Sequence, residues 1–199
     1  MTKGLPRSLA HATVGSGILS NATDGSAVAG TGVTGDGTEM GTFRKEVITL
    51  DAVEIALTDE AGVVAYGGVK IFDFAEGAIL LHGAVADLTV VKDAAGVNDD
   101  WDGDFGLGTV TAGNNAALAT TEQNIVPTTA TPQAVAGATT AQGKSTATES
   151  GSVLDGTTTP VDVYLNFLVD DADQDVTTTA TNLVVSGTVT LFYTPLGDL

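Results

Sequence analysis

Two segments near the C-terminus constrain the fold more than any other feature, because apolar residues recur in them at every second position. In residues 161–169 and 183–194 the recurring residues are Val161, Val163, Leu165, Phe167, Val169, Leu183, Val185, Val189, Leu191 and Tyr193. A β-strand turns successive side chains to opposite faces, so each segment presents one apolar face. The acidic connection between the segments is typical of an exposed loop. We therefore expect the two strands to pair antiparallel, as a closing hairpin over the core.

The rest of the chain continues this β pattern. It has 199 residues, of which only 16% are charged and 5% aromatic, and no stretch combines helical periodicity with helix caps. Strands are predicted at residues 43–57, 63–66, 69–74, 78–91 and 107–111, with a bend or bulge at Gly83. Residues 78–91 are the most apolar run, and we expect them to be the most buried. The pattern predicts an all-β protein: an antiparallel β-sandwich with jelly-roll or Greek-key connections.

The predicted organisation is a single sandwich domain over residues 42–199, preceded by an N-terminal arm over residues 1–41. The arm is rich in Gly, Ser and Thr, and it has too few apolar residues to offset the entropy of ordering itself. It is therefore either a disordered tail or an extended arm that adds a strand to a partner. In the second case the partner-binding residues are Lys3, Arg7, Val14, Ile18 and Leu19.

Within the domain, residues 112–160 form a long excursion rich in Thr, Ala and Gly. A stretch of this length without structure is unusual inside a compact domain. We expect it to contain short edge strands near residues 134–138 and 143–150, because Thr fits a pleated surface.

The charge balance excludes several kinds of partner. The chain has 25 acidic and 7 basic residues, for a net charge of −18. Nucleic acids and anionic membranes both require clustered Lys and Arg, so neither is expected to bind. No apolar run approaches the ~20 residues of a membrane helix, and no apolar region follows Lys3 and Arg7, so we expect no signal peptide. The absence of Cys excludes disulfides and thiolate metal sites.

One acidic segment has the spacing of a cation-binding loop. Asp100, Asp102 and Asp104 stand at every second position, an arrangement that presents several carboxylates to one Ca²⁺ ion. Phe105, however, occupies the position where an EF-hand loop requires Gly. The same spacing recurs at Asp171, Asp173 and Asp175. Each segment is therefore either a solvated acidic loop or a structural Ca²⁺ site, and no other cofactor is expected.

Trp101, the only tryptophan, lies within the first acidic segment. It either folds back as a lid over the end of the core or stacks against a sugar ring. His82 lies inside the most apolar predicted strand, where we expect a hydrogen-bonded core residue rather than a base. No catalytic sequence motif is present, and paired carboxylates are uninformative in so acidic a chain. We therefore expect no enzymatic activity.

Four stretches resemble structural proteins of tailed-bacteriophage virions, of the capsid decoration or cement type. They are residues 66–91 (YGGVKIFDFAEGAILLHGAVADLTVV), 106–112 (GLGTVTA), 124–130 (NIVPTTA) and 184–199 (VVSGTVTLFYTPLGDL). The resemblance implies a non-enzymatic β-sandwich that decorates and stabilises the outer capsid surface by bridging neighbouring capsid subunits. It implies the major capsid protein as the partner and a homo-oligomer, either a dimer or a trimer. Such a protein is made in the host cytoplasm without a signal peptide.

The alternative function is a binding module. A tail, fibre or surface protein of similar fold would recognise glycans through the Trp101 loop. This alternative requires the indole ring of Trp101 to be exposed, whereas the decoration hypothesis requires attachment through the arm and the sheet edges.

Overall fold

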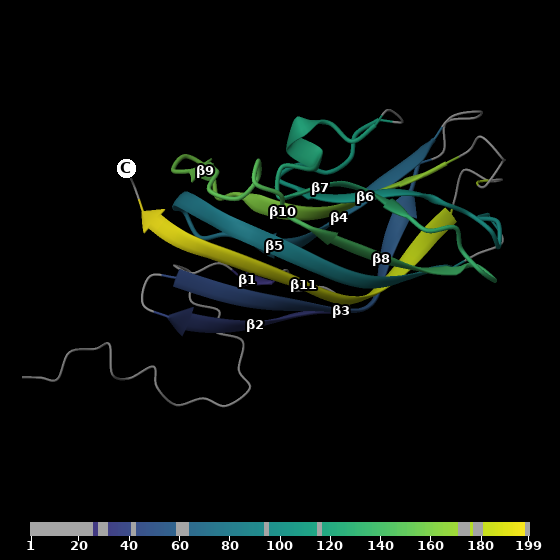
Figure 1. Cartoon of the computed structure of the whole chain (residues 1–199), viewed down its shortest axis with the longest axis horizontal. Coiled ribbons are helices and arrows are strands. Elements are labelled where there is room, and N and C mark those ends of the chain that lie inside the picture. Colours follow the sequence, from purple (N-terminus) through teal and green to yellow (C-terminus); the bar gives the residue numbers. More distant parts are fainter. Residues whose placement is uncertain are drawn as a thin grey trace, which may run out of the picture.

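A computed structural model of the chain describes residues 26–27, 32–40, 43–58, 64–93, 96–114, 117–170, 176 and 181–197. Apart from one 3₁₀ turn, Thr120–Glu122, the regular elements of these residues are all strands (Figure 1). The strands are β1 (Ser26–Ala27), β2 (Val33–Met40), β3 (Phe43–Leu57), β4 (Ala65–Asp73), β5 (Gly77–Lys92), β6 (Gly103–Gly108), β7 (Val126–Thr131), β8 (Ala138–Lys144), β9 (Val153–Gly156), β10 (Asp162–Val169) and β11 (Thr181–Gly197).

The strands form two antiparallel sheets that enclose one core, so the predicted all-β sandwich is confirmed. Sheet A has the order β1-β4-β10-β6-β7, and sheet B has the order β2-β3-β11-β5-β8, with β9 beside the start of β5, from Gly77 to Leu80. The aromatic residues Phe72, Phe74 and Tyr193 pack edge to face within the core. The bulge predicted at Gly83 is present: β5 gains one residue there relative to β11, and Gly83 adopts a φ of 151°.

The predicted closing hairpin is wrong. β10 pairs with β4 and β6 in sheet A, whereas β11 pairs with β3 and β5 in sheet B. The apolar faces of both strands are buried as expected, but they face each other across the core instead of lying side by side. An alternating pattern specifies which face is buried and carries no information on which strand lies alongside.

The sandwich also begins earlier in the chain than predicted. Residues 33–40, assigned to the arm, form strand β2 along β3, and Val33 packs against the core. The two-residue strand β1 pairs with Phe72 and Asp73 of β4. Glycine-rich β2 has no alternating apolar pattern, because backbone hydrogen bonds to β3 rather than buried side chains hold it in place.

The lateral sides of the sandwich differ. On one side, β7 of sheet A leads through a short turn to β8 of sheet B, so residues 134–137 form a turn and not the predicted edge strand. The second predicted edge strand, near residues 143–150, is also misplaced, because β8 ends at Lys144. Ser145 reinforces this closed side by accepting from Ala84 N–H and donating to the Ile125 carbonyl, at 2.7 and 2.6 Å. On the opposite side the sheets end in β1 and β2.

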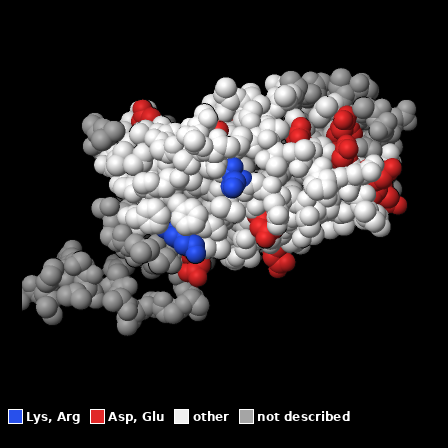
Figure 2. Space-filling model, in the orientation of Figure 1, with Lys and Arg blue, Asp and Glu red and all other residues white. Residues whose placement is uncertain are grey.

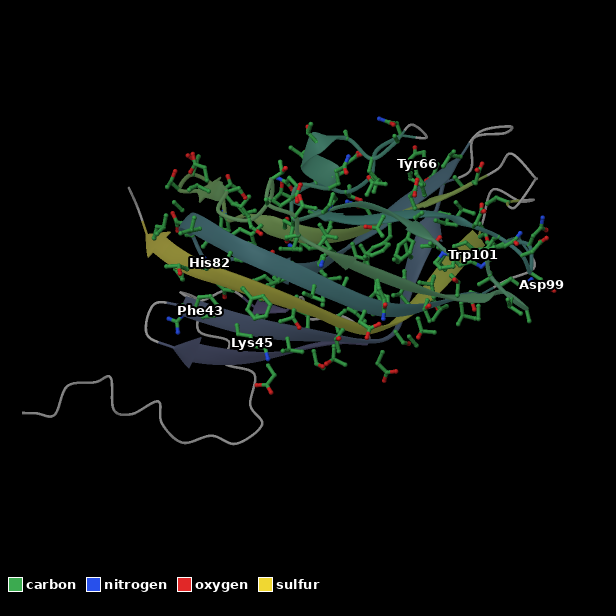
Figure 3. The ribbon with its side chains drawn as sticks, viewed as in Figure 1. Phe43, Lys45, Tyr66, His82, Asp99 and Trp101 are labelled. Atoms are coloured by element: carbon green, nitrogen blue, oxygen red, sulfur yellow. The ribbon has the colours of Figure 1, made fainter. Side chains whose placement is uncertain are left out.

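On the face shown in Figure 2, acidic side chains gather mainly toward the right-hand end, and basic side chains interrupt the uncharged surface near the centre and the left. The loop that carries Trp101 lies at this right-hand end, remote from Phe43 and His82 (Figure 3).

Candidate functional site

The structure resolves the two interpretations of Trp101. Its side chain is 0% exposed and belongs to the core, and its indole Nε1–H donates to the Gly137 carbonyl at 3.2 Å. The backbone of Trp101 also accepts from Ala134 N–H at 2.8 Å, so the residue ties its loop to the turn between β7 and β8. The lid interpretation is confirmed. A ring buried in this way offers no face to a sugar, so the stacking contact required for the glycan hypothesis is excluded.

The other predicted site residues fall into two groups. Lys3, Arg7, Val14, Ile18 and Leu19 of the arm, and Asp171, Asp173 and Asp175, lie outside the described residues. Asp100, Asp102 and Asp104 are described, but no group of three or more His, Asp or Glu residues in the described part of the chain is placed to hold a metal ion. Burial and then the charges of Asp102 and Asp170 raise the pKa of Asp104. The carboxylates therefore repel one another without converging on a shared site.

His82 is not the core residue that was predicted. It lies on the outer face of β5, where its Nε2 is 2.8 Å from Thr194 Oγ1. Its ring centroid is 5.2 Å from that of Phe43 on β3. The prediction failed because the bulge at Gly83 shifts the alternation of β5, and with it the face to which His82 points.

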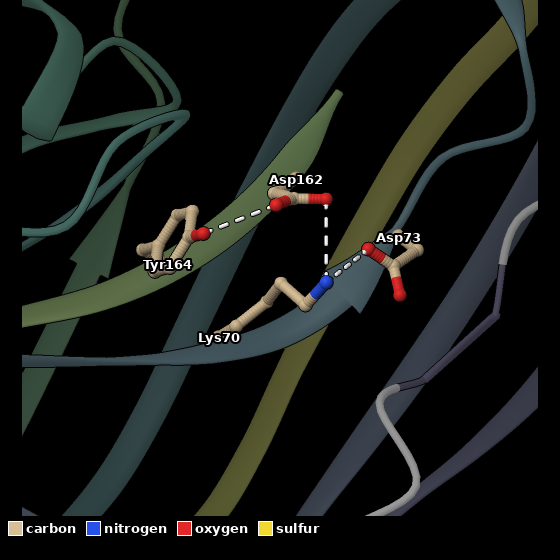
Figure 4. A network of polar contacts seen from close by, with 4 residues as sticks. All are labelled: Lys70, Asp73, Asp162 and Tyr164. Carbon is tan, nitrogen blue, oxygen red and sulfur yellow. Dashed lines mark hydrogen bonds and ion pairs between the residues drawn. The ribbon is translucent and has the colours of Figure 1, made fainter. Parts of the chain in front are cut away.

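A polar cluster of Lys70, Asp73, Asp162 and Tyr164 lies on the outer face of sheet A, where β4 pairs with β10 (Figure 4). Lys70 and Asp73 are three residues apart and would normally point to opposite faces. The register between β4 and β10 shifts there, so that both Ile71 and Phe72 are buried and the two charged residues share the outer face. This bulge creates the cluster, and the spacing of the charges alone did not reveal it.

The cluster contains one cation between two carboxylates. Lys70 Nζ lies 2.8 Å from Asp73 Oδ1 and 3.5 Å from Asp162 Oδ1, and Tyr164 donates its hydroxyl to Asp162 Oδ2 at 3.0 Å. Asp73 and Asp162 are direct cross-strand partners, an arrangement in which like charges repel. Lys70 offsets this repulsion, because its ammonium contacts both carboxyl groups.

The two carboxyl groups titrate in opposite directions. Burial, followed by a hydrogen bond with Asp162, raises the pKa of Asp73 in spite of Lys70. Burial also acts to raise the pKa of Asp162, but hydrogen bonds with Asp73, Tyr164 and Lys70 outweigh it and lower that pKa. As the pH falls, the pair therefore takes its first proton on Asp73, which then donates to Asp162. The hydrogen bond to Asp73 raises the pKa of Lys70, which keeps the ammonium charged.

This chemistry fits a structural clamp better than a reaction centre. A lysine that stays protonated is not a nucleophile. The cluster lies on the face of a sheet, and its three charged side chains are each about one-third exposed. A surface hollow lies instead over sheet B, lined by Val85, Ala86, Asp87, Gln142, Gly143 and Lys144. The clamp fastens β10 to β4 at the end where β1 joins the sheet.

The middle of the same face is covered by residues 109–114 and 117–125, and Asn166 anchors this cover. Asn166 is 0% exposed; its Oδ1 accepts from Ala112 N–H at 2.8 Å, and its Nδ2 donates to the carbonyls of Val110 and Glu122 at 2.9 and 2.8 Å. Gly108 permits the close approach, because a Cβ there would collide with the backbone of Thr121 and Glu122. Sequence reasoning missed this role, since an Asn between apolar residues on a strand resembles any exposed position.

A further titratable group faces the inner side of sheet B. Glu46 of β3 lies on the same side as Ile48 and Leu50, opposite Gly37 of β2 and Leu191 of β11. Burial, and then the charge of Asp36, raises the pKa of Glu46 from 4.5 to about 7. The folded chain therefore binds a proton at this residue under conditions where an exposed Glu is ionised.

No protein-family model matches the chain, and a search of curated proteins finds no match. Within the described residues, no helix is long and apolar enough to cross a membrane.

Proposed function

We propose that this chain is a non-enzymatic structural protein of a bacteriophage virion, which decorates the outer capsid surface and stabilises it by bridging neighbouring capsid subunits. The proposal assigns attachment to residues 1–25 and to the sheet edges that follow them. The major capsid protein is the partner. The resemblance of residues 66–91 and 184–199 to virion structural proteins supports this choice, and the net charge of −18 suits a surface turned away from packaged DNA.

The observation that carries the proposal is the pair of sheet edges on one lateral side of the sandwich. β1 is the edge of sheet A and β2 is the edge of sheet B, so the first two described strands form both edges on that side. An edge strand offers unpaired N–H and C=O groups to which a partner can add a strand. The chain thus leads from its N-terminal residues directly into two edges at which another subunit can dock.

The register identifies the backbone groups of β2 that point away from β3. The carbonyl of Gly32 accepts from Asp51 N–H at 2.6 Å, so Gly32 bonds directly to β3. Because hydrogen-bonded positions alternate along an antiparallel strand, Thr34 and Asp36 also direct their backbone groups toward β3. The N–H groups of Val33 and Gly35 therefore point outward, where the carbonyl groups of an added strand would accept hydrogen bonds from them.

The test is co-sedimentation with capsids that lack the protein. The full chain is expected to bind in a fixed ratio to capsid subunits and to raise the melting temperature of the capsid. A truncated chain that begins at Gly25 keeps β1 and β2 and is expected to bind more weakly. Gly35→Pro removes an outward N–H and should also weaken binding, whereas Thr34→Ala leaves every backbone donor in place and should not. Failure of the full chain to co-sediment would refute the proposed function.

A further inference from the structure

The side chains that β3, β11 and β5 turn away from the core form the outer face of sheet B. The strand register arranges these side chains in rows that run across the three strands. Across β3 and β11 the rows are Lys45 with Phe192, Thr49 with Thr188, and Glu54 with Val184. β5 continues the same rows with Gly83, Asp87 and Val91. On this face Val85 and Val91 are 46% and 39% exposed, so no described segment covers it as residues 109–114 and 117–125 cover sheet A.

One end of this face carries an aromatic group. The ring centroids of Phe43 and Phe192 are 6.2 Å apart, and that of His82 is 5.2 Å from Phe43. These residues come from β3, β11 and β5, so the group spans the width of three strands. Phe43 and Phe192 are half-buried, and such rings beside exposed valines are characteristic of surfaces that bind another protein.

The charges on this face differ between the two ends of the strands. Lys45 and Lys144 lie toward the aromatic end, and neither forms an ion pair within the part of the chain that the structure describes. Asp51 and Glu54 lie toward the other end of β3, and both are exposed. Asp36 of β2 is exposed in the same row as Lys144, so the aromatic half carries both signs, whereas Asp51 and Glu54 make the other half acidic.

We propose that two copies of the chain associate face to face through the outer face of sheet B, about a two-fold axis that crosses the strands near Thr188. This rotation reverses the direction of the strands but keeps their order. Each row of one copy therefore lies over the row of the other copy that is equally far from Thr188 on its opposite side. Lys45 of each copy then lies over Glu54 of the other, and Phe192 lies over Val184. Each contact occurs twice, as an isologous interface requires.

The contacts of this orientation differ from those of its alternative. A two-fold axis parallel to the strands would place β3 over β5 and β2 over β8, so that Lys45 faces Gly83 of the second copy and Asp36 faces Lys144. The crossing axis instead pairs Lys45 with Glu54 and places the Val91 side chain over Gly83, which has none. At the centre Asp87 of each copy approaches the other, which is unfavourable.

The size of the face suits such a dimer. Five strands spaced ~4.8 Å apart and about ten residues long at ~3.3 Å per residue cover roughly 800 Å². This equals the area of about 800 Å² that each partner contributes to a standard interface. The net negative charge of both copies opposes association, but salt at ~0.15 M screens charges that are more than about 8 Å apart.

The test is sedimentation equilibrium of the full chain at ~0.15 M salt, with charge-swapped variants. The unmodified chain is expected to show a monomer–dimer equilibrium. Lys45→Glu and Glu54→Lys each replace two attractive pairs by two repulsive ones and should weaken the dimer at least about tenfold. The double variant, Lys45→Glu with Glu54→Lys, recreates both pairs in swapped form and should restore most of the affinity. Asp87→Asn should strengthen the dimer several-fold.

Thr158→Glu, which adds an exposed carboxylate between β9 and β10, is the control for net charge and should leave the dissociation constant unchanged. Far-UV circular dichroism of each variant establishes that it is folded. The proposal would be overturned by a chain that stays monomeric, or by a dimer whose dissociation constant neither single charge reversal changes. It would also be overturned if the double variant dimerised no more tightly than the single variants. Since no capsid is used, a failure here is separate from a failure of the proposed capsid function.

Discussion

Replacement of Glu46 by Gln is expected to change the pH dependence of stability. Glu46 has a pKa of about 7 in the folded chain against 4.5 for an ordinary glutamate. The raised pKa means that its contribution to stability is fully present below pH 4.5 and is lost as the pH rises through about 7. Gln has the same shape as the protonated side chain and never ionises. The variant should therefore match the unmodified chain at pH 4.5 and be more stable at pH 8.5.

The magnitude follows from the two pKa values. A tenfold change in proton affinity corresponds to ~1.36 kcal/mol, so the full difference sets an upper limit of about 3 kcal/mol. Glu46 is only partly buried, and solvent screening reduces the expected gain to about 1–2 kcal/mol at pH 8.5. In a chain of this length that gain raises the melting temperature by roughly 3–6 °C.

Urea denaturation followed by tryptophan fluorescence is a suitable assay, because Trp101 is the only tryptophan and is buried in the native state. The control is Glu76→Gln, which removes an exposed carboxylate from the turn between β4 and β5. We expect the free energy of unfolding of the control to differ from that of the unmodified chain by a similar amount at both pH values. Equal stability of Glu46→Gln and the unmodified chain at pH 8.5 would refute the reasoning.

Two further substitutions test the outer face of sheet A. Asn166→Leu leaves buried backbone groups, including the Glu122 carbonyl, without hydrogen-bond partners. It should lower the free energy of unfolding, measured by urea denaturation, by about 3 kcal/mol. A loss below ~1 kcal/mol would contradict the anchoring role of Asn166. Lys70→Met removes the cation between Asp73 and Asp162 and should cost about 1 kcal/mol at pH 7, since the cluster is partly exposed. That cost should disappear as the pH falls through the lowered pKa of Asp162, and a cost that persists in acid would show that packing rather than charge is responsible.

The inner faces of the sandwich were predictable from the sequence, whereas the pairing of its strands was not. Alternation at Val163, Leu165 and Phe167 identified side chains that are fully buried. The same alternation is compatible with any neighbouring strand, so proximity in sequence suggested a hairpin that the structure does not contain. The expectation that residues 78–91 are the most buried was also wrong. β5 exposes alternate residues along most of its length, whereas β10 is covered on both faces.

The parts that sequence reasoning missed depend on distant contacts. Asn166 bonds to residues that are 44 to 56 positions away, so no local pattern marks it as an anchor. The Lys70 cluster requires a bulge that only the register with β10 reveals. Trp101 is the opposite case, because a single large aromatic residue in a loop is usually buried, and the expectation of a lid was correct.

The position of β11 has a consequence for biosynthesis. It is the central strand of sheet B and lies between β3 and β5, both of which are translated much earlier. Until β11 emerges from the ribosome, β3 and β5 present long edges that lack their common neighbour, and such edges recruit strands from other nascent chains. Joining them through β11 is a contact between distant parts of the chain, which makes folding slow. Chaperones that shield exposed strands during translation are therefore expected to increase the yield of folded protein.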